Sequence, residues 1–87
     1  MNIRSIHYTS DFADAYRKLP LEIKKAIDKK DKIFRKNPYH PGLQTHKLNG
    51  AFYGLWAFWV TKNYRVLFEF IKDGAIFYDV DTHDIYK

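Results

Sequence analysis

The chain has 87 residues, with 15 Lys and Arg against 10 Asp and Glu, a formal net charge of +5 and no cysteine. This length suits a single domain over residues 1–87, and without cysteine there are no disulfides or thiolate metal sites, so we expect a cytoplasmic protein. No apolar run is long enough for a signal peptide or a membrane span. The basic balance favours a polyanion, or an acidic protein segment, as the partner.

The first half of the chain predicts a strand followed by two helices. Residues 2–8 place spaced isoleucines before a helix-start signal, which favours a short strand. Residues 9–11, Thr-Ser-Asp, offer N-caps for a short helix that ends before Pro20. A second apolar stripe then predicts a helix over residues 21–36, which the following Asn-Pro pair stops.

The second predicted helix has a dense basic face opposite its apolar stripe. The basic residues are Lys24, Lys25, Lys29, Lys30, Lys32, Arg35 and Lys36. The acidic residues on that face are Glu22, Asp28 and Asp31. A solvated helix face explains this pattern, and a dedicated nucleic-acid surface is the alternative.

The second half of the chain predicts a loop and then strands. The segment NPYHPGLQTHKLNG, residues 37–50, contains two prolines and two glycines and reads as a long loop. Three strands are predicted, over residues 51–60, 64–71 and 75–81. Tight turns join them, the second at Asp73-Gly74. The predicted fold class is therefore α+β, with one N-terminal strand, two helices on one face of the sheet, and a three-strand antiparallel meander.

Alternation along a strand assigns its side chains to two faces of the sheet. In the last two strands the expected core residues are Val66, Phe68, Phe70, Ile76, Tyr78 and Val80. The opposite, open face is expected to hold Arg65, Phe77, Asp79 and Asp81. In the strand over residues 51–60 both sets are apolar. If Trp56, Phe58 and Val60 are the core set, Trp59 stands beside Arg65, where its indole either stacks on a base or partner, or packs against aliphatic neighbours.

Three segments resemble the RelE/YafQ/YoeB superfamily of bacterial toxin-antitoxin toxins, which includes plasmid-stabilisation toxins: QTHKLNG, GLWAFWVTKNYRVLFEF and DVDTHDIYK. The resemblance extends over essentially the whole chain and implies a RelE-like fold. It also implies an mRNA interferase, an endoribonuclease that cuts mRNA on the ribosome without metal or other cofactor. Its partners would be a cognate antitoxin protein, mRNA on the ribosome and ribosomal RNA. ParE-like members of the superfamily inhibit DNA gyrase instead, so chemistry must be argued from the site.

RNA cleavage without a metal needs a base for the 2′-hydroxyl, an acid for the leaving oxygen, and positive charge on the transition state. Histidine suits both proton roles. The resemblance assigns His46 and His83 as the acid-base pair, with their order left open, and Arg65 as the residue that holds the scissile phosphate. Tyr86 matches a C-terminal tyrosine that stacks on a base or assists proton transfer. Arg65 pairing with Glu69 or Asp79, and Tyr86 only pinning the tail, are the structural alternatives.

Three further residues are RNA-binding candidates: Lys47 beside His46, Trp59, and Lys62. Ala57 and Trp59 depart from the resemblance, because relatives carry polar groups on that strand. The departure leaves open a module that has lost catalysis and only binds an antitoxin. Gyrase inhibition is the other alternative.

Overall fold

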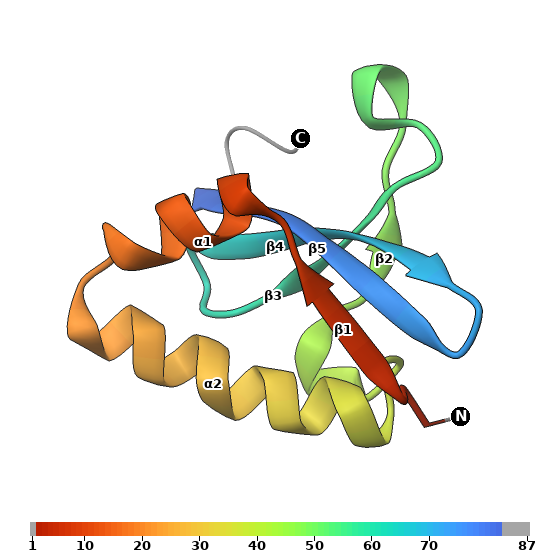
Figure 1. Cartoon of the computed structure of the whole chain (residues 1–87), viewed down its shortest axis with the longest axis horizontal. Coiled ribbons are helices and arrows are strands. Elements are labelled where there is room, and N and C mark those ends of the chain that lie inside the picture. The colour runs from red at the N-terminus through yellow and green to blue at the C-terminus, as the bar shows by residue number, and fades with distance from the viewer. Residues whose placement is uncertain (1, 83–87) are drawn as a thin grey trace.

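The computed structural model describes residues 2–82, in which two helices cover one face of a five-stranded sheet (Figure 1). The strands are β1 (Ser5–Tyr8), β2 (His46–Lys47), β3 (Trp56–Trp59), β4 (Tyr64–Ile71) and β5 (Gly74–Thr82). The helices are α1 (Ser10–Arg17) and α2 (Leu21–Lys36), with short 3₁₀ helices η1 (Pro41–Leu43) and η2 (Gly50–Phe52). The predicted α+β class is confirmed. No helix in residues 2–82 is long and apolar enough to cross a membrane.

The sheet has the strand order β1-β5-β4-β3-β2, with β1 parallel to β5 and the other pairs antiparallel. The predicted three-strand meander is confirmed as β3, β4 and β5. The prediction of a plain loop over residues 37–50 is wrong in one respect, because this segment contributes the edge strand β2. Two residues are too few to show alternation, so no sequence pattern marked this strand.

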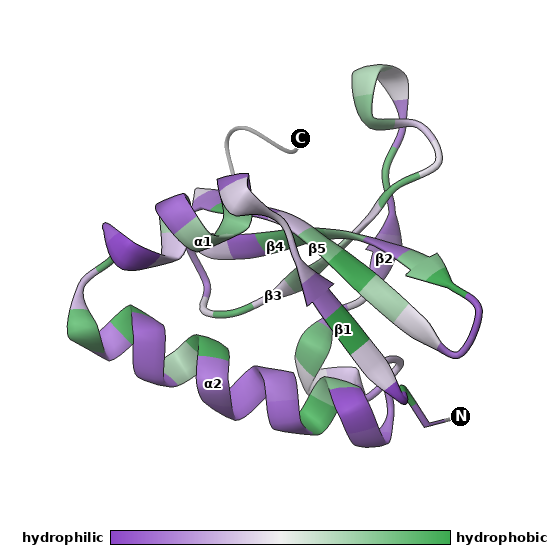
Figure 2. Cartoon of the chain, in the orientation of Figure 1, coloured by the Kyte–Doolittle hydropathy of each residue, from purple (hydrophilic) through white to green (hydrophobic). Residues whose placement is uncertain are grey.

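Both helices begin where the sequence predicts. Thr9 is the N-cap of α1 and its hydroxyl oxygen accepts a hydrogen bond from the Phe12 N–H at 3.1 Å. The same hydroxyl donates to the Tyr78 carbonyl at 3.0 Å, which ties the start of α1 to β5. Hydrophilic and hydrophobic residues alternate along α2 (Figure 2), and its buried residues include Phe34.

Aromatic rings build the core between the helices and the sheet. Phe34 of α2 is fully buried, and its ring centroid lies 5.0–5.4 Å from those of Phe58, Phe68 and Phe77. Trp56, Phe58 and Val60 belong to this cluster. The sequence left open which face of β3 is the core face, and the structure shows that it is the face with these three residues. Val66, Phe68 and Phe70 are confirmed as core residues of β4.

A β-bulge in β5 overturns part of the predicted face assignment. Phe68 lies opposite Phe77 and Val66 opposite Val80, so the facing segment of β5 contains one extra residue. Phe77 is therefore fully buried in the main core, where Val80 also lies, whereas Tyr78 packs on the open face. The predictions of Ile76 and Tyr78 as core residues, and of Phe77 on the open face, are wrong because alternation fails across a bulge.

The open face carries a second, smaller apolar cluster. Leu48, Ala57 and Leu67 are buried there, and Phe52, Leu55 and Tyr78 pack against them. The residues come from β3, β4, β5 and the β2–β3 connection, whose η2 segment projects beyond the sheet (Figure 1). The centre of the open face is thus apolar and covered by the chain itself.

Candidate active site

His46 lies on the exposed edge strand β2, opposite Ala57 of β3. Its Nδ1 atom is 2.7 Å from the Gln44 carbonyl oxygen. A carbonyl oxygen can only accept, so this contact requires the proton on Nδ1 and leaves the Nε2 lone pair of a neutral ring available. The local fold therefore presents His46 as a proton acceptor at the sheet edge.

Arg65 of β4 is buried, with 3% of its surface exposed, and faces the β3–β4 turn. Its Nη1 atom donates to the carbonyl oxygens of Thr61 at 3.1 Å, Lys62 at 2.9 Å and Tyr64 at 3.3 Å. The guanidinium carbon lies 4.2 Å from the centroid of the Trp59 ring, a cation–π contact. Burial lowers the pKa of Arg65, but a guanidinium stays charged near neutral pH.

Glu69 and Asp79, the carboxylates offered as alternative partners of Arg65, bind other groups. Glu69 accepts the Tyr78 hydroxyl at 2.7 Å, and Asp79 accepts the Val80 N–H at 2.8 Å. The ion pairs found within residues 2–82 do not include Arg65. The alternative in which Arg65 pairs with Glu69 or Asp79 is therefore wrong, and carbonyl dipoles and an indole face surround its charge.

The structure does not bring His46 and Arg65 into contact. His46 lies opposite Ala57, whereas Arg65 lies opposite Trp59, two residues further along β3 and one strand beyond it. Two strand spacings and two residues place their backbones about 12 Å apart. Ala57 and Leu67 lie between them and are buried. A bound molecule would have to span this apolar centre to meet both side chains.

The predicted RNA-binding residues are spread around the β2–β4 side of the sheet. Lys47 points to the helix side, away from His46, with its Nζ atom 5.5 Å from the centroid of the Trp56 ring. Trp59 is half-buried beside Arg65, as expected. Lys62 is exposed in the β3–β4 turn, where its carbonyl binds Arg65.

The remaining predicted site residues, His83 and Tyr86, lie outside the described residues. Thr82 is the last residue described, and it lies opposite Tyr64. The described part of β5 thus ends beside Arg65, at the β3–β4 turn. Within residues 2–82, no three His, Asp or Glu side chains are grouped as metal ligands.

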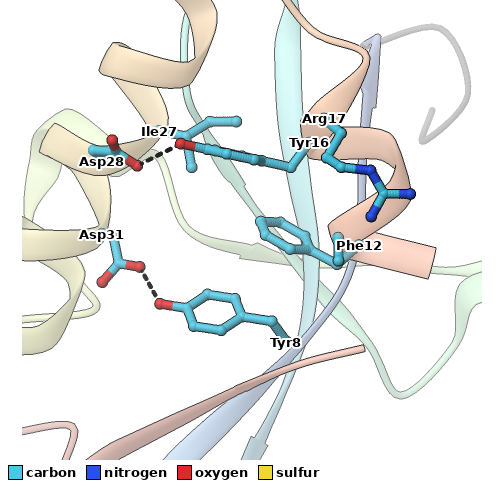
Figure 3. Close-up of a pocket in the computed structure, with 8 residues that line it drawn as sticks. Tyr8, Phe12, Tyr16, Arg17, Ile27, Asp28 and Asp31 are labelled. Carbon is cyan, nitrogen blue, oxygen red and sulfur yellow. Dashed lines mark hydrogen bonds between the residues drawn. The ribbon is translucent and has the colours of Figure 1, made fainter. Parts of the chain in front are cut away.

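A groove of about 350 Å³ lies on the other side of the sheet, between the two helices and β1. Figure 3 shows the Tyr8 hydroxyl bound to Asp31 and the Tyr16 hydroxyl bound to Asp28. The oxygen–oxygen distances are 2.5 Å and 3.1 Å. Burial and these carboxylates raise the pKa of both tyrosines. The sequence assigned both aspartates to the charged face of α2, because nothing local shows that β1 and α1 direct tyrosines toward them.

Sequence reasoning also missed a cavity of about 380 Å³ at the β2–β3 connection. Its lining residues are Lys47, Leu48, Asn49, Tyr53, Gly54, Leu55 and Trp56. The prediction of one strand over residues 51–60 is wrong at its start, because β3 begins only at Trp56 and the preceding residues form this loop. Gly50 and Gly54 were the sequence signal for the loop. Both glycines have positive φ, 65° and 92°, which side-chain-bearing residues rarely adopt.

Solved toxin structures share this fold over more than nine-tenths of the chain. YafQ from E. coli is 16% identical, with 94% of this chain and 96% of that chain covered and a TM-score of 0.68. RelE in the RelB-RelE antitoxin-toxin complex from Methanococcus jannaschii is 20% identical, with 91% and 92% covered and a TM-score of 0.69. The toxin-antitoxin complex RelBE2 from Mycobacterium tuberculosis matches at 17% identity, 91% and 96% coverage and a TM-score of 0.75.

These matches establish a RelE-like fold and confirm the fold that the sequence resemblance implied. No protein-family model and no curated protein matches the sequence. At such low identity the likeness describes architecture, and the activity must be argued from the residues of this chain.

Proposed function

We propose that this chain is the cytoplasmic toxin of a type II toxin-antitoxin system, an endoribonuclease that cuts mRNA on the ribosome. The observation that carries the proposal is His46, a histidine with an available Nε2 atom on an exposed edge of a fold shared with solved toxins. The net charge of +5 suits a nucleic-acid substrate.

In the proposed reaction, one histidine removes the proton from the 2′-hydroxyl group and the oxygen attacks the adjacent phosphorus. The bond to the 5′-oxygen breaks, and the second histidine protonates that oxygen. His46, with its Nδ1 proton held by a carbonyl, suits the base role, and His83 is then the acid. The products are a cyclic phosphate and a free 5′-hydroxyl, and the proposed reaction requires no cofactor.

In this proposal, Arg65 acts on the phosphate indirectly, through the β3–β4 turn. Its guanidinium holds the carbonyls of the β3–β4 turn, which presents the exposed ammonium group of Lys62. We propose that Lys62 contacts the phosphate, and that Arg65 adds positive potential and keeps Lys62 in position. Trp59, beside Arg65, and Tyr86 are the candidate stacking surfaces for bases near the cut.

A cognate antitoxin is the proposed protein partner, and ribosomal RNA is the proposed docking surface. Two of the three similar structures described above are complexes of a toxin with an antitoxin. An acidic or amphipathic antitoxin segment would complement the basic side chains of α2.

A binding module without catalysis is the second candidate function. The observation that favours it is the apolar, buried pair Ala57 and Leu67 between His46 and Arg65. Such a module would bind the antitoxin and would be harmless when expressed alone.

The test is to induce the chain alone and to measure protein synthesis while mapping mRNA 5′ ends. The variants are His46→Ala and His83→Ala, with His7→Ala as the matched control. His7 is also an exposed histidine, but it lies on β1, the opposite edge of the sheet. Cleavage within translated codons that only the His46 and His83 variants lose is the expected result. Intact mRNA with normal translation would refute the nuclease, and arrested replication would indicate gyrase inhibition.

A further inference from the structure

The cavity at the β2–β3 connection is lined in part by an exposed aromatic ring, that of Tyr53. Tyr53 is 84% exposed, more than Tyr8, Leu21 or Tyr39, the other exposed large hydrophobic residues in the described part of the chain. Exposed aromatic rings on nucleic-acid-binding proteins are stacking surfaces for bases. Tyr53 is therefore a candidate contact rather than a core residue.

Local hydrogen bonds hold Tyr53 in a defined place. Its N–H donates to the Gly50 carbonyl at 3.1 Å, and the Leu55 N–H donates to the Phe52 carbonyl at 3.0 Å. The base of the loop is closed by the Leu48 N–H, which donates to the Leu55 carbonyl at 2.9 Å. Leu48 is buried in the open-face cluster, so the loop that carries Tyr53 is anchored to the sheet.

The other walls of the cavity supply a cation, a second ring and an amide. Lys47 lies over the Trp56 ring, so a positive charge and an aromatic face stand together. Asn49 is the N-cap of η2 but makes no side-chain capping hydrogen bond, which leaves its amide for a ligand. Among residues 2–82, the lining contains no acidic residue that would repel a phosphate.

We propose that this cavity binds one unstacked nucleotide of single-stranded RNA. The base stacks on Tyr53 and reaches Trp56, Asn49 pairs with the base edge, and Lys47 contacts the phosphate.

Lys47 and His46 are consecutive residues of β2 and point to opposite faces of this edge strand. RNA bound in the cavity would have to cross this edge strand to reach His46. This link to cleavage rests on the proposed function, whereas RNA binding in the cavity does not require it.

The two tryptophans of the chain make the test specific. Trp59→Phe leaves Trp56 as the single reporter in the cavity, and Trp56→Phe leaves Trp59 as the reporter beside Arg65. Titration with a short oligouridylate should quench Trp56 fluorescence by stacking. In the Trp59→Phe background, Tyr53→Ala should weaken binding about tenfold or more, whereas Tyr53→Phe keeps the ring and the affinity. Lys47→Ala should reduce the slope of log affinity against log salt by about 0.7.

Three outcomes would overturn the proposal. One is quenching of Trp59 alone, with affinity insensitive to Tyr53→Ala, because the RNA then lies on the open face. Another is an unchanged RNA affinity in Tyr53→Ala with weakened antitoxin capture, because the loop is then a protein contact. The third is no RNA binding by the folded chain. By contrast, Trp56 quenching that needs Tyr53, together with intact mRNA in cells, supports the pocket and refutes only the nuclease.

Discussion

At the scale of single residues, the buried Arg65 side chain holds the β3–β4 turn through hydrogen bonds to its carbonyl oxygens. Its Nη1 atom binds three carbonyl oxygens and its guanidinium lies against Trp59, so the charge is solvated by the protein. A lysine ammonium lacks the planar face that lies against the Trp59 ring. Any loss of activity in an Arg65 variant therefore has to be separated from loss of the β3–β4 turn.

We expect Arg65→Lys to lower the free energy of unfolding by about 1–3 kcal/mol, because the side chain is buried, and an ammonium is more strongly hydrated than a guanidinium and lacks its planar face. Urea denaturation measures this change. Arg4→Lys is the control, since Arg4 is exposed, and it should shift stability by less than about 0.5 kcal/mol. Equal stabilities for the two variants would contradict the role of Arg65 in holding the turn.

Tyr8 makes the stability of the fold depend on pH in the alkaline range. Burial, and next the hydrogen bond to Asp31, raise the pKa of Tyr8 above the ordinary tyrosine value of about 10. The folded state holds the phenolic proton more tightly than the unfolded chain does. The resulting stabilisation is complete below the unfolded pKa of about 10 and is lost as pH rises through the folded pKa.

We therefore expect the unfolding free energy to fall less steeply between about pH 9 and pH 11 in Tyr8→Phe than in the parent chain. Urea titrations across this range measure the slope. Tyr53→Phe is the matched control, because it also removes one phenol, but from a ring that is 84% exposed. Identical slopes for the parent chain and Tyr8→Phe would refute the link.

At the scale of elements, Gly74 in the β4–β5 hairpin allows β1 to pack closely against β5. The chain pairs Ile71 with Gly74, so Lys72 and Asp73 form the turn, and Asp73 has the positive φ of 58°. Gly74 is instead the first residue of β5, opposite Ser5 of β1. A Cβ atom at Gly74 would lie 2.5 Å from the Ser5 carbonyl oxygen.

Gly74→Ala should thus push β1 away from β5 and lower stability by about 1–3 kcal/mol. Thermal denaturation measures the loss, and faster amide exchange in β1 would locate it. Asp73→Gly is the control in the same hairpin, where relief of the positive φ should leave stability unchanged or raise it by up to about 1 kcal/mol. A tolerated Gly74→Ala would mean that the two strands separate without cost.

At the scale of the whole molecule, a small chain gains its stability from aromatic packing on one side of the sheet. Phe34 connects α2 to three strands through ring contacts. The open-face cluster is smaller, and part of it comes from the β2–β3 connection. The helix side therefore contributes most of the apolar packing that maintains the fold.

Phe34→Ala should cost about 3–5 kcal/mol, a large share of the roughly 5–15 kcal/mol that stabilises a small domain. Circular dichroism during urea denaturation should show a partly or fully unfolded chain. Leu21→Ala is the matched control on the same helix, because Leu21 is 66% exposed, and it should change little. A cooperative, near-parental transition in Phe34→Ala would contradict the central position of this ring.

The sequence by itself determined the features that depend on neighbouring residues. These are both helices with an N-cap among residues 9–11, the β3–β4–β5 meander and the core set of β4. Caps, helical periodicity and strand alternation are local, so they can be recognised without a fold.

Only the tertiary structure decided what depends on distant segments. It added β2, introduced the bulge that buries Phe77, enclosed Arg65 in carbonyls, and exposed Tyr53. Strand pairing, burial and cavity shape arise from contacts between residues far apart in the chain, and no local pattern encodes which partners meet.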